Sequence, residues 1–166
     1  WIRSKLGQHM VAAGGADRFI YVSRRDSPRR VLLNEDRLWL ELSALGFELV
    51  VPGELSVVEQ IRAFSSARLI VVTHGAALAN LIFAPRDAAI VEIASTAIGR
   101  MDDFRRTARS MGQNMVTVMS DQYPKSAEPP LLLDMHSDYL VDIDAVLEAV
   151  RKLRGSLQGT YSAHVT

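Results

Sequence analysis

A histidine and a glycine stand side by side in the segment Thr73-His74-Gly75-Ala76, directly after the apolar run Leu69 to Val72. That run is short and rich in β-branched residues, which is typical of a strand buried on both faces. A glycine at the end of such a strand lets the backbone turn and leaves the amides of Gly75 and Ala76 free to meet an anion. The segment is therefore interpreted either as a site for a phosphorylated ligand or as a plain tight connection.

Guanidinium groups gather in another short segment, at Arg24, Arg25, Arg29 and Arg30. Each guanidinium can bind a phosphate through paired donors, so a local anion site is one interpretation. A solvated arginine-rich loop is the other. Over the whole chain 19 basic residues balance 19 acidic ones, which argues against a long groove for nucleic acid.

The elements that must position these groups alternate between strand-like and helix-like patterns. The expected strands are Phe19 to Ser23, Phe47 to Val51, Leu69 to Thr73, Ala88 to Ile93, Met115 to Met119 and a short piece from Tyr139 to Val141. Because parallel neighbours need right-handed crossovers, this alternation predicts a doubly wound α/β fold. The sheet is expected to be mostly parallel, with helices on both faces.

Capping and stop signals delimit the expected helices. Ser56 and Glu59 form a capping box, and Gly112 is a stop signal. The expected helices are 34–45, capped by Asn34 and ended by Gly46, then a helix after Ser56, 76–82, 102–111 capped by Asp102, and a last helix to Leu153.

Ligands of such sheets lie outside the carboxyl ends of the strands. The segments 23–30, 73–76 and 92–99 all follow expected strands. We therefore expect the arginine segment and the glycine turn to face one cleft. Glu92 is expected either to accept hydrogen bonds from ribose hydroxyls or to pair with an arginine.

Length and composition restrict the possible functions. With 166 residues the chain fits one domain, with a leading helix over 1–16 and an exposed loop over 122–136. Cysteine is absent, which excludes disulfides, thiolate zinc sites and cysteine nucleophiles. We find no apolar run of transmembrane length and no signal peptide, so a soluble, cytoplasmic location is expected.

Other catalytic or metal-binding patterns have simpler explanations. Asp142 and Asp144 have the spacing of a metal-binding pair, but they precede an apolar-periodic helix, so capping explains both. The histidines lack the close spacing of a zinc site, and Ser23 and Ser95 lack a nucleophile-elbow context. The Gly-x-Gly-x-x-Gly pattern of dinucleotide oxidoreductases is also absent. The histidines concerned are His9, His74, His136 and His164.

Several separated motifs together resemble the carboxyl-terminal half of glycosyltransferase family 61, over about Arg18 to Val150. The family includes eukaryotic N-acetylglucosaminyl- and pentosyltransferases and bacterial proteins of capsular polysaccharide biosynthesis. Any one of these motifs alone carries little weight, but several of them in the family's order are specific for the family. The motifs are Ser23-Arg24-Arg25, Arg30 to Glu35, Leu55 to Ile61, His74 to Phe83 and Ile90 to Ile93.

The resemblance implies the donor-binding half of a GT-B-like enzyme with two Rossmann-like halves. It implies an inverting transfer from a nucleotide sugar, usually a uridine diphosphate (UDP) sugar, to a glycan acceptor, without a bound metal or a tightly bound cofactor. The other half is expected to come from a missing amino-terminal segment or a partner subunit, so this chain alone is expected to be weakly active or inactive. Capsular or other surface polysaccharide synthesis is the implied setting.

The resemblance also implies roles for particular residues. Arg24, Arg25 and Arg30, with the amides of Gly75 and Ala76, are expected to stabilise the charge on the leaving phosphate. His74 is expected to contact the phosphate or the sugar. Asn80 is expected to tie down a neighbouring loop instead of contacting the ligand.

An inverting transfer also needs a base for the acceptor hydroxyl. His74, Glu92 and a residue from the other half are the candidates for that base. A noncatalytic Rossmann-like module in a polysaccharide-synthesis assembly is the alternative function.

Overall fold

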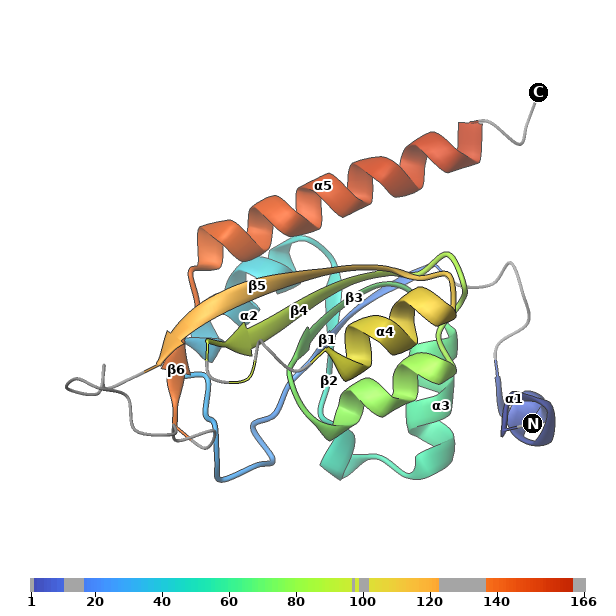
Figure 1. Ribbon diagram of the computed structural model, residues 1–166, viewed down its shortest axis with the longest axis horizontal. Helices are drawn as coiled ribbons and strands as arrows, with labels where there is room; N and C mark the ends of the chain where they lie inside the picture. Colours follow the sequence, from blue (N-terminus) through green and yellow to red (C-terminus); the bar gives the residue numbers. More distant parts are fainter. Residues whose placement is uncertain (1, 11–16, 97, 99–101, 123–136, 163–166) are drawn as a thin grey trace.

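The computed structural model describes residues 2–10, 17–96, 98, 102–122 and 137–162. Its centre is a parallel sheet in the strand order β2-β1-β3-β4-β5, with the short strand β6 added antiparallel to β5 (Figure 1). The order changes direction between β1 and β3, which is the topological switch point of such a sheet. The strands are β1 (Arg18–Val22), β2 (Phe47–Val50), β3 (Ala67–Thr73), β4 (Ala89–Ser95), β5 (Asn114–Gln122) and β6 (Tyr139–Leu140).

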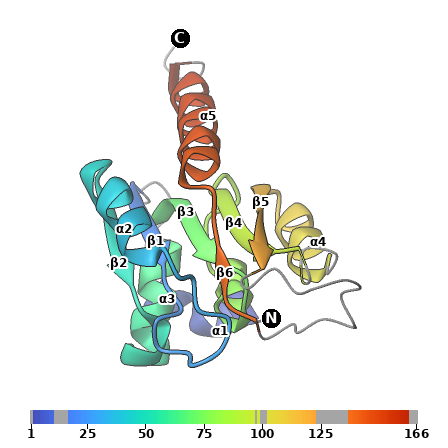
Figure 2. The ribbon, with the colours of Figure 1, turned by 90° about the vertical axis from the view of Figure 1, so that its left-hand side faces the viewer.

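Helices cover both faces of the sheet, as expected for a doubly wound fold. On one face lie α2 (Glu35–Ala44) and α5 (Ile143–Ser162), and on the other α3 (Val57–Ser65), the 3₁₀ helix η3 (Ala76–Ile82) and α4 (Asp103–Ser110). The long helix α5 runs beyond the sheet in both views (Figures 1 and 2). The predicted α/β, Rossmann-like fold is confirmed.

Alternation along the strands sends apolar side chains to both helical layers. Ile70 and Val72 of β3 pack toward α3, η3 and α4, whereas Leu69 and Val71 pack toward α2 and α5. Every residue of β4 is buried, which is why its sequence is a nearly continuous apolar run. The charged Glu92 inside this strand must therefore find polar partners within the fold.

The amino-terminal elements are short. The chain begins with α1 (Ile2–Leu6) and the 3₁₀ helix η1 (Gly7–His9), and Leu6 and Met10 pack on the core beside α3. A second 3₁₀ helix, η2 (Pro52–Glu54), follows β2. The expected leading helix over 1–16 is thus shorter than predicted, and 11–16 lies outside the described residues, as does nearly all of the expected loop 122–136.

Most of the predicted helix signals act as expected. Ser56 and Glu59 form the capping box of α3. Gly46 ends α2 with φ 86°, a left-handed conformation that favours glycine. Asp142 accepts a hydrogen bond from the amide of Ala145 at 3.2 Å, which confirms capping for that carboxylate.

Two predicted caps are wrong in detail. Asn34 stands at the N-cap of α2, but its amide instead bonds both backbone groups of Val141, at 2.8 and 3.2 Å. Asp102 precedes α4, but its carboxylate binds Arg105 and Arg106. A distant partner for Asn34, and two arginines of the same helix for Asp102, take the side chains that would otherwise cap the backbone.

No helix in the described part of the chain is both long enough and apolar enough to cross a membrane.

Candidate functional site

The arginine segment and the glycine turn meet at the carboxyl edge of the sheet, as predicted. Nη1 of Arg24 donates a hydrogen bond to the carbonyl oxygen of His74 at 3.0 Å, and Nη2 donates to Oγ of Ser27 at 3.0 Å. The side chain of Arg24 lies so close over Gly75 that a Cβ there would overlap Nη1. Both residues follow neighbouring strands, β1 and β3, at the switch point.

The reason for glycine at position 75 differs from the expected one. Gly75 has φ 168°, which is extended backbone that any residue adopts, so the turn itself does not require glycine. The space above its Cα is filled by the guanidinium of Arg24. Glycine is needed here because it lets this cation approach the backbone closely.

Arg24 and Arg30 are two cations that lack a carboxylate partner among the described residues. Nε of each is buried without a hydrogen-bond partner there. Burial lowers the pKa of the Arg30 guanidinium, and the nearby charge of Arg24 lowers it further. Two close, unneutralised guanidiniums produce a positive potential that an anionic ligand would relieve.

The backbone of Arg30 is strained. Its φ is 58°, a left-handed conformation that costs a non-glycine residue of the order of 1 kcal/mol or more. Strain of this kind persists only where the surroundings hold the residue, and it is enriched at ligand sites.

Strand β6 supplies part of that support. The amide of Tyr139 donates to the carbonyl of Val31 at 3.0 Å, and the carbonyl of Tyr139 accepts from Leu33 at 2.9 Å. Oδ1 of Asp138 accepts a further hydrogen bond from Val31 at 2.8 Å. The segment that follows the arginines is therefore held by a strand more than 100 residues later.

The phenol of Tyr139 interacts electrostatically with the guanidiniums of Arg24 and Arg30, and these three side chains are called the arginine cluster below. Its side chain is buried, and burial raises its pKa to about 12, against the opposing charges of Arg24 and Arg30. Sequence reasoning missed Tyr139 as part of the site, because no local pattern near it indicates which segment its strand will pair with.

Among the described residues, Arg25 differs from Arg24 and Arg30 in having carboxylate partners. Its guanidinium lies 3.6 Å from Asp36 and 4.0 Å from Glu35, at the acidic start of α2. Glu35 also accepts hydrogen bonds from Tyr21 at 2.7 Å and from Ser23 at 2.5 Å. Carboxylates therefore already face the charge of Arg25, and its contact with phosphate stays a prediction.

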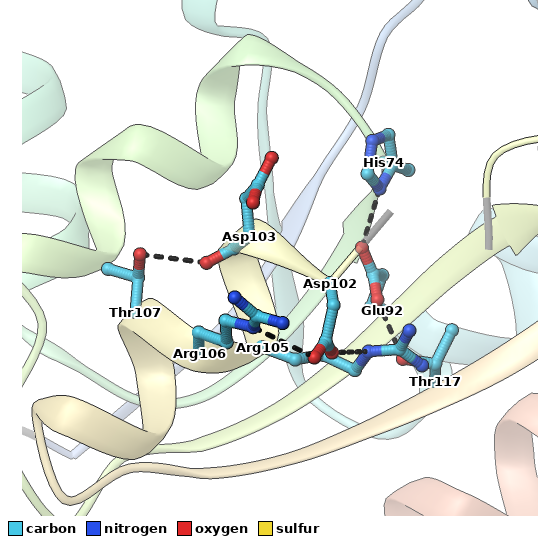
Figure 3. Close-up of polar contacts among 8 residues, drawn as sticks. All are labelled: His74, Glu92, Asp102, Asp103, Arg105, Arg106, Thr107 and Thr117. Atoms are coloured by element: carbon cyan, nitrogen blue, oxygen red, sulfur yellow. Dashed lines mark hydrogen bonds and ion pairs between the residues drawn. The ribbon is translucent and has the colours of Figure 1, made fainter. Parts of the chain in front are cut away.

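The side chains of His74, Glu92 and Thr117 form a line (Figure 3). Nδ1 of His74 lies 2.7 Å from Oε1 of Glu92, and Oε2 of Glu92 accepts a hydrogen bond from Oγ1 of Thr117 at 2.6 Å. His74 and Glu92 are only 8% and 3% exposed. The ring of Phe104, from the first turn of α4, meets the imidazole edge-on at 5.5 Å between ring centres.

The carboxylate of Glu92 affects which nitrogen of the His74 imidazole carries a proton. A carboxylate at Nδ1 favours a proton on that nitrogen, so the neutral ring keeps Nε2 as an acceptor. Nε2 has no hydrogen-bond partner within the described residues. An imidazole held in this way can accept a proton from a substrate hydroxyl.

Glu92 does not have the partner that was expected. Both carboxylate oxygens are engaged within the fold, by His74 and Thr117, and neither by an arginine. At 3% exposure the carboxylate is largely shielded from solvent, and its contact with a ribose stays a prediction. Sequence reasoning missed Thr117. The available signal was its position two residues after the apolar Met115, because residues two apart in a strand lie on the same face of the sheet.

The remaining predicted residues lie around this edge. Ala76 begins η3, where the first amides of a helix have no partner inside it. Asn80 donates to Gln60 at 2.9 Å, and Gln60 bonds the carbonyls of Pro52 and Leu55, which confirms that Asn80 ties down a loop. His136 and His164 lie outside the described residues. Within those residues, no three side chains of the metal-ligating types gather to hold a metal ion.

In a comparison with models of protein families, residues 1–91 match Glycosyltransferase 61. The match spans more than half of the 166 residues. It includes Arg24, Arg30, His74 and Gly75, and it ends at Val91, one residue before Glu92. No curated protein matches the chain.

Proposed function

Because the chain belongs to glycosyltransferase family 61, we propose that it is the donor-binding half of an inverting, metal-independent transferase that uses a nucleotide sugar. UDP is the proposed nucleotide. The observation that carries this proposal is the pair Arg24 and Arg30, two guanidiniums without carboxylate partners in the described chain. Arg24 lies against Gly75 at the switch point of the sheet, and Arg30 is close enough to feel its charge.

The chemistry of the reaction fits this pair. When the sugar leaves the nucleotide, negative charge develops on the departing phosphate oxygen in the transition state. Fixed cations therefore stabilise the transition state more strongly than the ground state. Arg24 is held by His74 and Ser27 before any ligand arrives, so little reorganisation is needed. The amides of Gly75 and Ala76 are proposed to add neutral donors beside it.

His74 is the proposed general base. As the acceptor hydroxyl oxygen attacks the anomeric carbon, its proton passes to Nε2, while Glu92 stabilises the imidazolium that forms. The bond from the anomeric carbon to the phosphate oxygen breaks in the same displacement, which inverts the configuration. Arg24 bonds the backbone of His74, so the cation for the leaving group lies against the short segment that carries the base.

The acceptor is proposed to be a glycan of a surface polysaccharide, bound largely by a second half or a partner subunit. The described residues contain one Rossmann-like sheet, whereas a GT-B enzyme has two. UDP binding is therefore a more direct test of this chain than turnover.

Calorimetric titration of the 166-residue chain with UDP tests the proposal. We expect saturable binding that weakens about 10-fold or more in Arg24→Ala, since hydrogen bonds to charged groups contribute roughly 1.5–3 kcal/mol. Arg109→Ala is the matched control, because Arg109 is exposed in the last turn of α4, which leads to the opposite edge of the sheet. Equal affinity in the two variants would contradict the phosphate site.

A further inference from the structure

We propose that Thr117 is a positioning residue of this site, which sets the carboxylate of Glu92 and through it the tautomer of His74. The inference rests on the proposed role of His74 as base. Thr117 lies outside the segment that matches the family model, which ends at Val91. The assignment therefore depends on the contacts of this chain alone.

The strand register places Thr117 where it can act. Glu92 and Thr117 are direct partners on the neighbouring parallel strands β4 and β5, so their side chains leave the sheet on the same face. The bond from Oγ1 of Thr117 to Oε2 is 2.6 Å, and Nδ1 of His74 lies 2.7 Å from Oε1. Each carboxylate oxygen thus has its own partner.

Two partners constrain a carboxylate more than one does. The terminal torsion of a glutamate is broad, so a carboxylate held only by His74 can rotate and exchange its oxygens. A hydroxyl donor on the second oxygen fixes the plane of the group. The imidazole then meets one acceptor in one orientation, which keeps the proton on Nδ1 and leaves Nε2 free for the substrate.

Oγ1 of Thr117 donates this hydrogen bond and the carboxylate of Glu92 accepts it, because a carboxylate oxygen has no proton to give. Phe104 packs on the imidazole edge and restricts ring rotation, but it cannot select a tautomer, because it offers no hydrogen-bonding atom.

Nuclear magnetic resonance of the ¹⁵N-labelled chain tests the proposal without requiring turnover. In the wild type we expect His74 in the Nδ1–H tautomer at neutral pH, with a slowly exchanging Nδ1 proton. In Thr117→Val we expect that proton to exchange at least about 10-fold faster and the ring nitrogen shifts to move toward a mixture of tautomers. Thr117→Ser, which keeps the hydroxyl, should retain the wild-type signals.

Matched controls separate positioning from general destabilisation. Thr107→Val removes a hydroxyl that bonds only the carbonyl of Asp103 in α4, and it should leave the His74 signals unchanged. Glu92→Gln should abolish the preference for the Nδ1–H tautomer. The proposal is overturned if Thr117→Val keeps the wild-type exchange rate, or if His74 of the wild type carries its proton on Nε2; the second result does not depend on how any variant folds.

Failure of this inference can be told from failure of the proposed function. Thr117 makes no contact with Arg24, so Thr117→Val should bind UDP within about twofold of the wild type. Absent UDP binding in the wild type, together with the expected tautomer changes, would remove the transferase proposal and keep the positioning role. Normal UDP binding in the wild type, together with an unchanged tautomer in Thr117→Val, would remove the positioning role and keep the transferase proposal.

Discussion

Gly75→Ala should weaken ligand binding without impairing folding, because the Cβ that it adds meets only the guanidinium end of the Arg24 side chain. The new Cβ would overlap Nη1 of Arg24 and lie 3.1 Å from its Cζ. Both atoms belong to the far end of a flexible side chain, which can move away. The φ of 168° at this position suits alanine as well as glycine.

The expected magnitudes differ for stability and affinity. The variant loses the hydrogen bond from Arg24 to the carbonyl of His74, which lowers stability. Alanine in place of glycine raises stability by about 0.4–1 kcal/mol, because it reduces the conformational entropy of the unfolded chain. We therefore expect the free energy of unfolding to change by less than about 1 kcal/mol. Displacement of the guanidinium should remove about 1.5–3 kcal/mol of binding to UDP, which corresponds to roughly 10- to 150-fold weaker affinity.

A double-mutant cycle with UDP titration shows whether Gly75 acts through Arg24. In the Arg24→Ala background, Gly75→Ala should have almost no further effect on affinity, because the displaced group is already gone. Gly155→Ala is the control, since a Cβ there meets nothing within 4 Å. Fully additive losses in the cycle would refute the reasoning and assign the effect to the backbone of Gly75 itself.

Two further outcomes follow from the same cluster. Arg25→Ala should weaken UDP binding less than Arg24→Ala, because Glu35 and Asp36 already face its charge; titrations of both variants check the ranking, and an equal loss would show that Arg25 also reaches the phosphate. Tyr139 has a folded pKa of about 12, above the ordinary value near 10, so its contribution to stability is complete below pH 10 and is lost as pH rises toward 12. Thermal melts of Tyr139→Phe between those pH values should show a smaller alkaline loss of stability than the wild type, and identical pH profiles would argue against a buried neutral phenol.

The sequence was sufficient to predict the parts of the fold that depend on local pattern. Apolar runs such as Leu69 to Thr73 identify buried strands, and the Ser56 and Glu59 pair marks the start of α3. The meeting of Arg24 with Gly75 was also predictable, because parallel strands bring their carboxyl ends to one edge. These inferences need element type and order but no knowledge of exact contacts.

The polar partners could not be predicted in the same way. The pairing of Glu92 with Thr117 depends on which strands are neighbours and on their register, neither of which a single sequence specifies. The contact of β6 with the segment after the arginines joins residues more than 100 positions apart. Likewise, Asn34 has the residue type and position of a cap, yet its amide bonds Val141, which only the assembled chain brings close.

The pairing of Tyr139 with Val31 and Leu33 sets a practical limit on how the chain can be shortened. The family match stops at residue 91, yet the strand whose backbone bonds the segment after the arginines lies at 139–140. A fragment trimmed to the matched region would keep Arg24 and Arg30 in its sequence but lose that strand. A shortened chain for the nucleotide titrations therefore has to extend through β6, well past the residues that match the family.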